Sequence, residues 1–99
     1  MSAVKVLIVD DEPDILEFVG YNLKNAGYLV KKAQSGKEAI ELNKTFLPQL
    51  IILDVMMPEI DGIETCYQIK SQKTFNDPKI IFLGAWVGGG RSPKNKNKL

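Results

Sequence analysis

The chain has 99 residues, 44% hydrophobic and 25% charged, with a formal net charge of +1, which indicates a single globular domain. No apolar run is long enough to span a membrane and the N-terminus lacks a signal-peptide pattern, so we expect a cytoplasmic protein. One cysteine, Cys66, excludes an intramolecular disulfide, and the absence of histidine excludes histidine metal sites and Ser-His-Asp catalysis.

The N-terminal part begins with a strand pattern followed by a helix pattern. Residues 4–9 are apolar and rich in β-branched side chains apart from Lys5, and they lead into Asp10 and Asp11, which is typical of a strand leaving the core. A helix is predicted from Pro13, which suits a first helical turn, and Gly27 is expected just beyond its end.

A second strand and helix follow in the same order. Residues 28–33 read as a short strand. Ser35 and Glu38 have the spacing of a capping box, so a helix is expected to start there. This alternation predicts parallel strands joined by right-handed crossovers.

The stretch 50–62 carries the strongest pattern in the chain. Residues 50–53 are a continuous apolar run, typical of a strand buried on both faces, and they lead into Asp54. Pro58 and the turn dipeptide Asp61-Gly62 indicate that an ordered loop follows this strand. Ligands of open α/β sheets bind outside the carboxyl ends of the strands, which is where Asp54 is placed.

A third helix and a fourth strand complete the readable pattern. The helix is predicted at 63–70 and the strand, with a buried pattern, at 79–83. We therefore predict an α/β fold with a flavodoxin-like parallel sheet of order 2-1-3-4 and helices on both faces. The helix residues expected to face inward are Ile63, Cys66, Tyr67 and Ile69.

This strand order brings Asp10, Asp11 and Asp54 to one edge of the sheet. Three like charges in one cleft favour a compensating cation, and clustered carboxylates suit Mg²⁺ or another hard divalent ion. A metal beside a strand-end aspartate favours phosphoryl chemistry. Ordinary solvated carboxylates at the ends of two strands are the alternative explanation.

The ordered set of Asp10-Asp11, Leu53-Asp54-Val55-Met56-Met57-Pro58 and Asp61-Gly62 resembles the receiver domain of two-component response regulators. The resemblance implies that Asp54 is the phosphoacceptor and Asp11 a direct Mg²⁺ ligand. Asp10 would hold the ion through water, and Met56 would offer its backbone carbonyl. The resemblance also implies a sensor histidine kinase or phosphotransfer protein as partner, with self-phosphorylation and self-dephosphorylation as the only catalysis.

The C-terminal part departs from the receiver pattern. Gly84 stands where receivers carry Thr or Ser, and no fourth helix, fifth strand ending in Lys-Pro or fifth helix is readable. We therefore expect residues 1–83 to form a receiver-like domain that lacks its fifth βα unit through truncation, frame change or an alternative C-terminus. The strand at 79–83 becomes an open edge, through which we expect self-association.

Residues 84–99 are Gly-rich and then basic, and we expect them to be disordered. The run Gly88-Gly89-Gly90 favours a linker over a phosphate cradle, because no Gly-Lys-Ser/Thr follows it. The basic residues favour a solvated tail over a nucleic-acid contact. Trp86 is expected to cover the end of the fourth strand, with anchoring of a partner as the alternative.

Two functions fit these residues. The first is a phosphoacceptor signalling domain that uses Asp54 and Mg²⁺. The second is a phosphorylation-impaired, degenerate receiver that acts as a protein-binding or assembly module, which Gly84 and the missing lysine favour. Catalysis on an external substrate is the least favoured, and neither a membrane nor nucleic acid is an expected partner.

Overall fold

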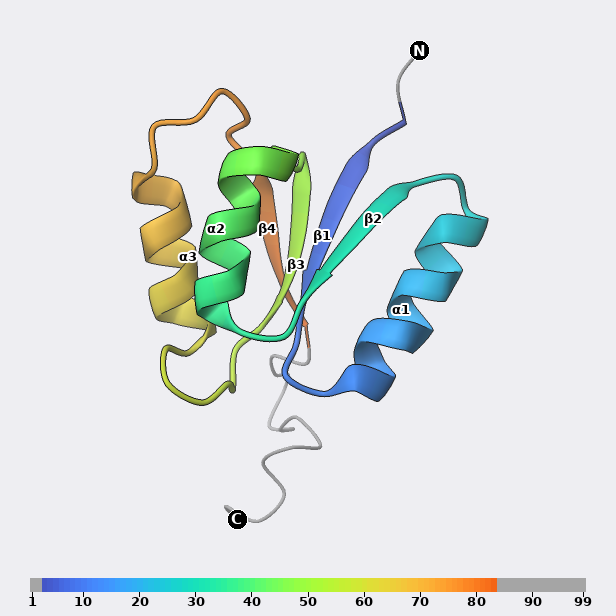
Figure 1. Ribbon diagram of the computed structural model, residues 1–99, viewed down its shortest axis with the longest axis horizontal. Helices are drawn as coiled ribbons and strands as arrows, with labels where there is room; N and C mark the ends of the chain where they lie inside the picture. Colours follow the sequence, from blue (N-terminus) through green and yellow to red (C-terminus); the bar gives the residue numbers. More distant parts are fainter. Residues whose placement is uncertain (1–2, 84–99) are drawn as a thin grey trace.

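The computed structural model describes residues 3–83. In these residues four strands alternate with three helices (Figure 1), and each predicted element is present within about one residue of its expected bounds. The elements are β1 (Lys5–Val9), α1 (Pro13–Asn25), β2 (Leu29–Ala33), α2 (Gly36–Phe46), β3 (Leu50–Asp54), α3 (Gly62–Ser71) and β4 (Lys79–Leu83). The predictions made for residues 84–99 lie outside the described residues.

The four strands form one parallel sheet in the order β2-β1-β3-β4, as predicted. Val9 at the end of β1 is in register with Ala33 of β2 and with Leu53 of β3. Asp54 at the end of β3 is in register with Leu83 of β4. The carboxyl ends of all four strands therefore meet at one edge of the sheet.

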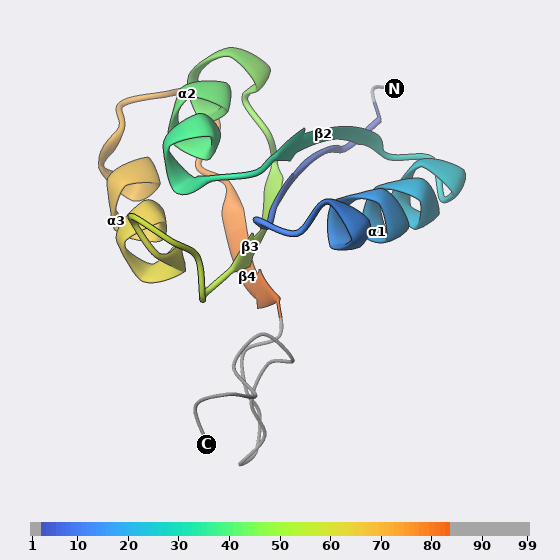
Figure 2. The same cartoon turned by 60° about the horizontal axis from the view of Figure 1, so that its bottom comes forward.

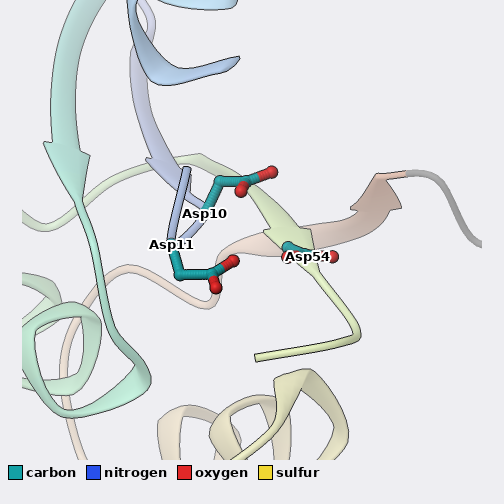
Figure 3. Close-up of side chains that lie close together, drawn as sticks. All are labelled: Asp10, Asp11 and Asp54. Atoms are coloured by element: carbon teal, nitrogen blue, oxygen red, sulfur yellow. The ribbon is translucent and has the colours of Figure 1, made fainter. Parts of the chain in front are cut away.

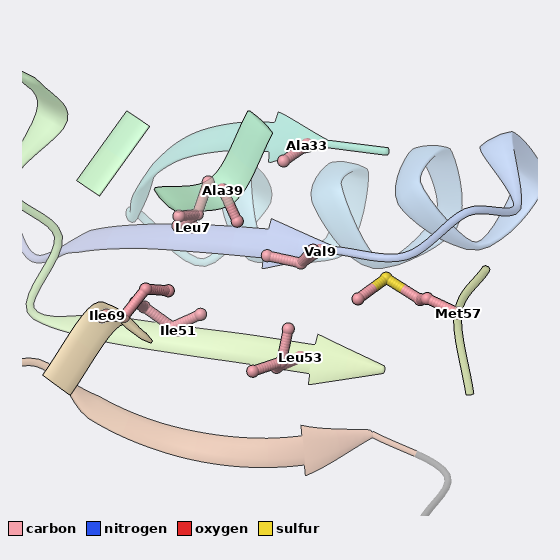
Figure 4. Close-up of a cluster of buried hydrophobic side chains, with 8 residues drawn as sticks. All are labelled: Leu7, Val9, Ala33, Ala39, Ile51, Leu53, Met57 and Ile69. Atoms are coloured by element: carbon pink, nitrogen blue, oxygen red, sulfur yellow. The ribbon is translucent and has the colours of Figure 1, made fainter. Parts of the chain in front are cut away.

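The helices cover both faces of the sheet, with α1 on one face and α2 and α3 on the other (Figure 1, Figure 2). Because side chains alternate along a strand, β1 contributes to both sides. Leu7 and Val9 belong to the core under α2 and α3 (Figure 4), and Val6 and Ile8 pack with Leu16 of α1. A strand with two buried faces explains the unbroken apolar run that marks β1 in the sequence.

The local signals for helix boundaries act as predicted. Gly27 follows the end of α1 with a φ of 101°, a left-handed value that glycine adopts without a Cβ clash. Ser35 caps α2 by accepting a hydrogen bond from the Glu38 N–H at 3.1 Å. Glu38 reaches back to the N–H of Gln34, at 2.9 Å, rather than to that of Ser35 itself. None of the helices in residues 3–83 is both long and apolar enough to cross a membrane.

The inward face of α3 was only partly predicted. Ile69 is buried and Cys66 half-buried as expected, but Ile63 is 57% and Tyr67 69% exposed. Thr65 occupies the core position instead, and its hydroxyl donates to a backbone carbonyl four residues earlier at 2.8 Å. Apolar character alone was not enough to predict the inward face of α3. A threonine whose hydroxyl is hydrogen-bonded packs inward as well as an aliphatic side chain does.

The apolar side chains of β4 are less covered than those of the inner strands, as expected for a strand at an open edge. Ile81 is 52% exposed, and Ile80 and Phe82 are only partly buried. The cause is position, because β4 is an edge strand of the sheet in residues 3–83 and α1, the helix on the Ile81 side, packs chiefly against β1 and β2. An apolar run of this kind predicts a strand correctly without predicting what covers it.

Candidate functional site

Three carboxylates gather at the carboxyl edge of the sheet. Asp10 and Asp11 follow β1, and Asp54 is the last residue of β3 (Figure 3). One carboxylate oxygen from each residue lies within 4.8 Å of the other two. Asp10 and Asp54 are each 2% exposed, and Asp11 is half-buried. The predicted acidic cluster is therefore formed, and it follows from the pairing of β1 with β3.

Backbone N–H groups fix the orientation of the two buried carboxylates. The Asp10 Oδ1 accepts a hydrogen bond from the Glu12 N–H at 2.9 Å. The backbone N–H of Asp10 donates to the Ala33 carbonyl at 3.1 Å. The Asp54 Oδ1 accepts one from the Met56 N–H at 3.2 Å. Each of these side chains thus accepts a hydrogen bond from the backbone N–H of the residue two positions later, a local pattern that aspartate favours.

The loop after β3 approaches the site closely through Gly62. The Gly62 N–H donates to the Val55 carbonyl at 2.9 Å, and a Cβ at this position would overlap the Asp54 carbonyl oxygen and stand 2.7 Å from the Val55 Cα. Asp61 caps α3 by accepting from the Glu64 N–H at 2.9 Å. The sequence indicates the Asp61-Gly62 turn, but nothing in it reveals that Gly62 is needed for contact with the backbone of the site.

The residues present fit a hard divalent cation. Carboxylate oxygens are the donors that Mg²⁺ and Ca²⁺ take in proteins. Two of the three carboxylates are almost entirely buried, and burial strengthens the repulsion among like charges. A cation between them would remove that repulsion. The expected role of the Met56 carbonyl as a ligand stays a prediction.

Residues 6–88 match the family described as the response regulator receiver domain. The chain belongs to this family. Over 69 residues, the receiver is 49% identical to the alkaline phosphatase synthesis transcriptional regulatory protein PhoP of Bacillus subtilis, covering 70% of the chain and 29% of PhoP. It is 42% identical over 82 residues to the response regulator MprA of Mycolicibacterium vanbaalenii, covering 83% of the chain and 35% of MprA. The receiver thus spans about a third of these relatives' length.

Solved structures agree with this assignment. The receiver is similar to the chemotaxis protein CheY4 of Vibrio cholerae, with a TM-score of 0.82 and 31% identity over 98% of this chain and 78% of that one. It is also similar to a chain in the crystal structure of the histidine kinase ThkA in complex with the response regulator TrrA, with a TM-score of 0.75 and 34% identity over 94% and 78% of the two chains. Both the predicted family and the predicted strand order are confirmed.

Proposed function

We propose that this receiver is a phosphoacceptor signalling domain that takes a phosphoryl group onto Asp54. The observation that supports it best is the position of Asp54. It is a nearly buried carboxylate at the end of a central strand, with Asp10 and Asp11 within 4.8 Å. In this proposal Mg²⁺ is held by Asp11, Asp54 and the Met56 carbonyl, with Asp10 acting through water.

The chain's own residues have defined tasks in this reaction. A carboxylate oxygen of Asp54 attacks the phosphorus of the donor, and the bond from phosphorus to the leaving group breaks in line with that attack. The hydrogen bond from the Met56 N–H fixes the plane of the Asp54 carboxylate. When bound, the ion neutralises charge on the phosphoryl oxygens. Attack by water on the phosphorus later returns the carboxylate.

A histidine kinase or a phosphotransfer protein is the proposed donor. The support is the structural neighbour found in a complex of a histidine kinase with a response regulator. The chain itself has no histidine, so a phosphohistidine donor has to come from another protein. No external substrate is converted in this proposal, since the phosphoryl group moves only onto the domain and off it.

The deciding experiment is intact-mass spectrometry after incubation with Mg²⁺ and a small phosphodonor. We expect the protein to gain one phosphoryl group. When a chelator removes Mg²⁺ before the donor is added, we expect no gain. The Asp54→Asn variant should gain none, whereas Asp14→Asn, which changes an exposed acid on α1, should gain it normally. Equal labelling of the Asp54→Asn variant would refute the assignment of the acceptor.

A phosphorylation-impaired binding module is the second candidate, and one sequence feature favours it. Gly84 follows β4 where receivers carry a hydroxyl, and no residue of the chain matches the family's lysine. Losing one preorganised donor of this kind slows a reaction by roughly 10²–10³. We therefore expect slow uptake beside a complete receiver with the same donor. Uptake at equal speed would contradict the impairment, and no uptake would favour the binding module.

A further inference from the structure

Thr65 is a buried polar side chain that makes no direct contribution to the phosphoacceptor reaction. It lies in the first turn of α3 and is fully buried. Its hydroxyl donates a hydrogen bond to the Asp61 carbonyl at 2.8 Å, and its backbone N–H donates to the same oxygen at 3.0 Å. Threonine and valine have similar shapes, so what a threonine adds at a buried position is a hydroxyl that forms hydrogen bonds.

The hydrogen bond from Thr65 holds a peptide unit that also contacts the loop after β3. The Asp61 carbonyl and the Gly62 N–H belong to one peptide unit, which is planar. The Gly62 N–H donates to the Val55 carbonyl at 2.9 Å. Because the peptide plane is rigid, a bond that holds the Asp61 carbonyl also sets the direction of the Gly62 N–H. Thr65 and Val55 therefore hold opposite sides of the same peptide plane.

A second peptide unit continues this series to Asp54. The Val55 carbonyl and the Met56 N–H belong to one peptide unit, and the Met56 N–H donates to the Asp54 Oδ1 at 3.2 Å. Three hydrogen bonds and two peptide planes thus run from the buried Thr65 hydroxyl to the Asp54 carboxylate. All three bonds point the same way from donor to acceptor, and hydrogen bonds in such a chain polarise and strengthen one another.

The beginning of α2 holds the Thr65 side chain in place. Gly36 is the first residue of α2, and a Cβ at this position would overlap the Thr65 Oγ1 and stand 2.7 Å from the Ile60 Cγ1. Figure 1 shows the first turns of α2 and α3 at the same end of the sheet as the loop that follows β3. Because the α2 backbone approaches so closely, Thr65 has little room to adopt another rotamer.

We propose that Thr65 is a positioning residue for Asp54 and acts through a relay of two peptide units, Asp61–Gly62 and Val55–Met56. The relay fixes the Met56 N–H against one oxygen of the Asp54 carboxylate and thereby sets the direction of the other oxygen. This role rests on the phosphoacceptor function proposed above, in which alignment of the attacking carboxylate oxygen lowers the barrier to phosphoryl transfer.

Two substitutions at Thr65 separate positioning from packing. Thr65→Val keeps the volume and loses the hydroxyl, whereas Thr65→Ser keeps the hydroxyl and loses a methyl group. Without Mg²⁺ or a phosphodonor, we expect Thr65→Val to move the Met56 amide resonance. It should also speed hydrogen exchange at the Gly62 N–H by roughly tenfold, the equivalent of one lost hydrogen bond. Thr65→Ser should lower the thermal stability, as a lost buried methyl group does, and leave both amide signals near the wild type.

Two further variants test the direction of the effect. Ser71→Ala is the matched control, because Ser71 lies at the other end of α3 and its hydroxyl also donates to a carbonyl four residues earlier at 2.8 Å. It should leave both amide signals unchanged. Gly36→Ala keeps the Thr65 hydroxyl but displaces it from the α2 side. It should move the same two amide signals that Thr65→Val moves.

The functional consequence is the rate of phosphoryl uptake with Mg²⁺ and a small phosphodonor. We expect Thr65→Val to slow uptake by roughly tenfold, the low end of the range for residues that orient a metal site from outside it, and Thr65→Ser to match the wild type. Equal effects of Thr65→Val and Thr65→Ser on the amide signals and on uptake would show packing alone and overturn the relay. A wild-type Met56 signal or wild-type uptake in Thr65→Val would also overturn it. A wild-type protein that takes up no phosphoryl group, with amide signals that change in Thr65→Val and not in Thr65→Ser, would refute the phosphoacceptor function and support the relay.

Discussion

Buried polar side chains are found at both ends of the sheet, but they are organised in opposite ways. At the amino end, Asn43 is fully buried and its Nδ2 donates to the Gln72 Oε1 at 2.6 Å. The Asn76 Nδ2 donates to the Asn43 Oδ1 and to the Pro48 carbonyl, both at 2.8 Å, and the Gln72 Nε2 donates to the Ile40 carbonyl at 3.1 Å. These neutral amides tie α2 to the segment between α3 and β4.

At the carboxyl end, Asp10, Asp11 and Asp54 bring carboxylates of like charge within 4.8 Å of one another. Carboxylates accept hydrogen bonds but cannot donate them when ionised, so they cannot satisfy one another as amides do. The amides at the amino end join one another and backbone carbonyls, whereas the two buried carboxylates at the carboxyl end accept from the backbone N–H groups of Glu12 and Met56. The difference teaches that neutral amides can join two elements to each other directly, whereas clustered like charges favour an added opposite charge.

The largest effect on stability is expected at the amino end. Asn43→Ala removes the donor to the part-buried Gln72 Oε1 and one of the two acceptors of the Asn76 Nδ2, which keeps only the Pro48 carbonyl. We expect a loss of about 3 kcal/mol in the free energy of unfolding, measured by urea denaturation. Asn22→Ala, which removes only an exposed side-chain bond to the Phe18 carbonyl, is the control. Equal losses in the two variants would show that the buried amides do not stabilise this end.

A smaller loss is expected at the carboxyl end from Gly62→Ala. The added methyl group overlaps the Asp54 carbonyl and the Val55 Cα, and backbone atoms cannot yield as a flexible side chain does. We expect a loss of about 2 kcal/mol, typical of overpacking, together with slower phosphoryl uptake because Asp54 is displaced.

Gly20→Ala is the matched control for this change. Its added methyl group meets the Lys32 Cε at 2.9 Å, which is part of a flexible stem, and alanine is the better helix former in α1. Its stability should be equal to the wild type or higher, and its phosphoryl uptake unchanged. A Gly62→Ala variant that matches Gly20→Ala in both measurements would show that the close approach at Gly62 has no consequence.

The smallest effect has the opposite sign. Asp10→Asn keeps the Oδ1 acceptor for the Glu12 N–H but removes one of the three clustered charges. Without Mg²⁺ we expect a gain of about 1 kcal/mol in stability, the order of the interaction between two unit charges about 4 Å apart in a well-solvated setting. Thermal denaturation should also show that Mg²⁺ stabilises the wild type more than the variant. Destabilisation of the metal-free variant would mean that the site is not under charge repulsion.

Sequence patterns predicted the parts of the molecule that depend on neighbours along the chain. The apolar run before Asp54, the Ser35 cap and the position of Gly27 all follow from local rules, and the strand order then brought Asp10 beside Asp54. The exposure of Tyr67 could not be predicted, because it depends on which helix α3 packs against rather than on its own periodicity. The close approach of Gly62 likewise depends on three-dimensional proximity.

The amide network of the amino end was missed for a related reason. Asn43 is in α2, Gln72 directly follows the end of α3, and Asn76 is in a loop, so their separations along the chain carry no periodic signal. Aspartates after apolar runs stand out in a sequence, whereas amides within helices resemble solvated residues. The site was therefore easier to predict than the network that supports the opposite end.

The central place of β1 in the sheet has a kinetic consequence. Asp10 and Asp54 are separated by α1, β2, α2 and most of β3, so their meeting requires two successive crossovers to close. Contacts between such distant segments form late and slowly in folding. A cation bound there would accordingly do little to the rate of folding, and would instead lengthen the lifetime of the native state by slowing its unfolding.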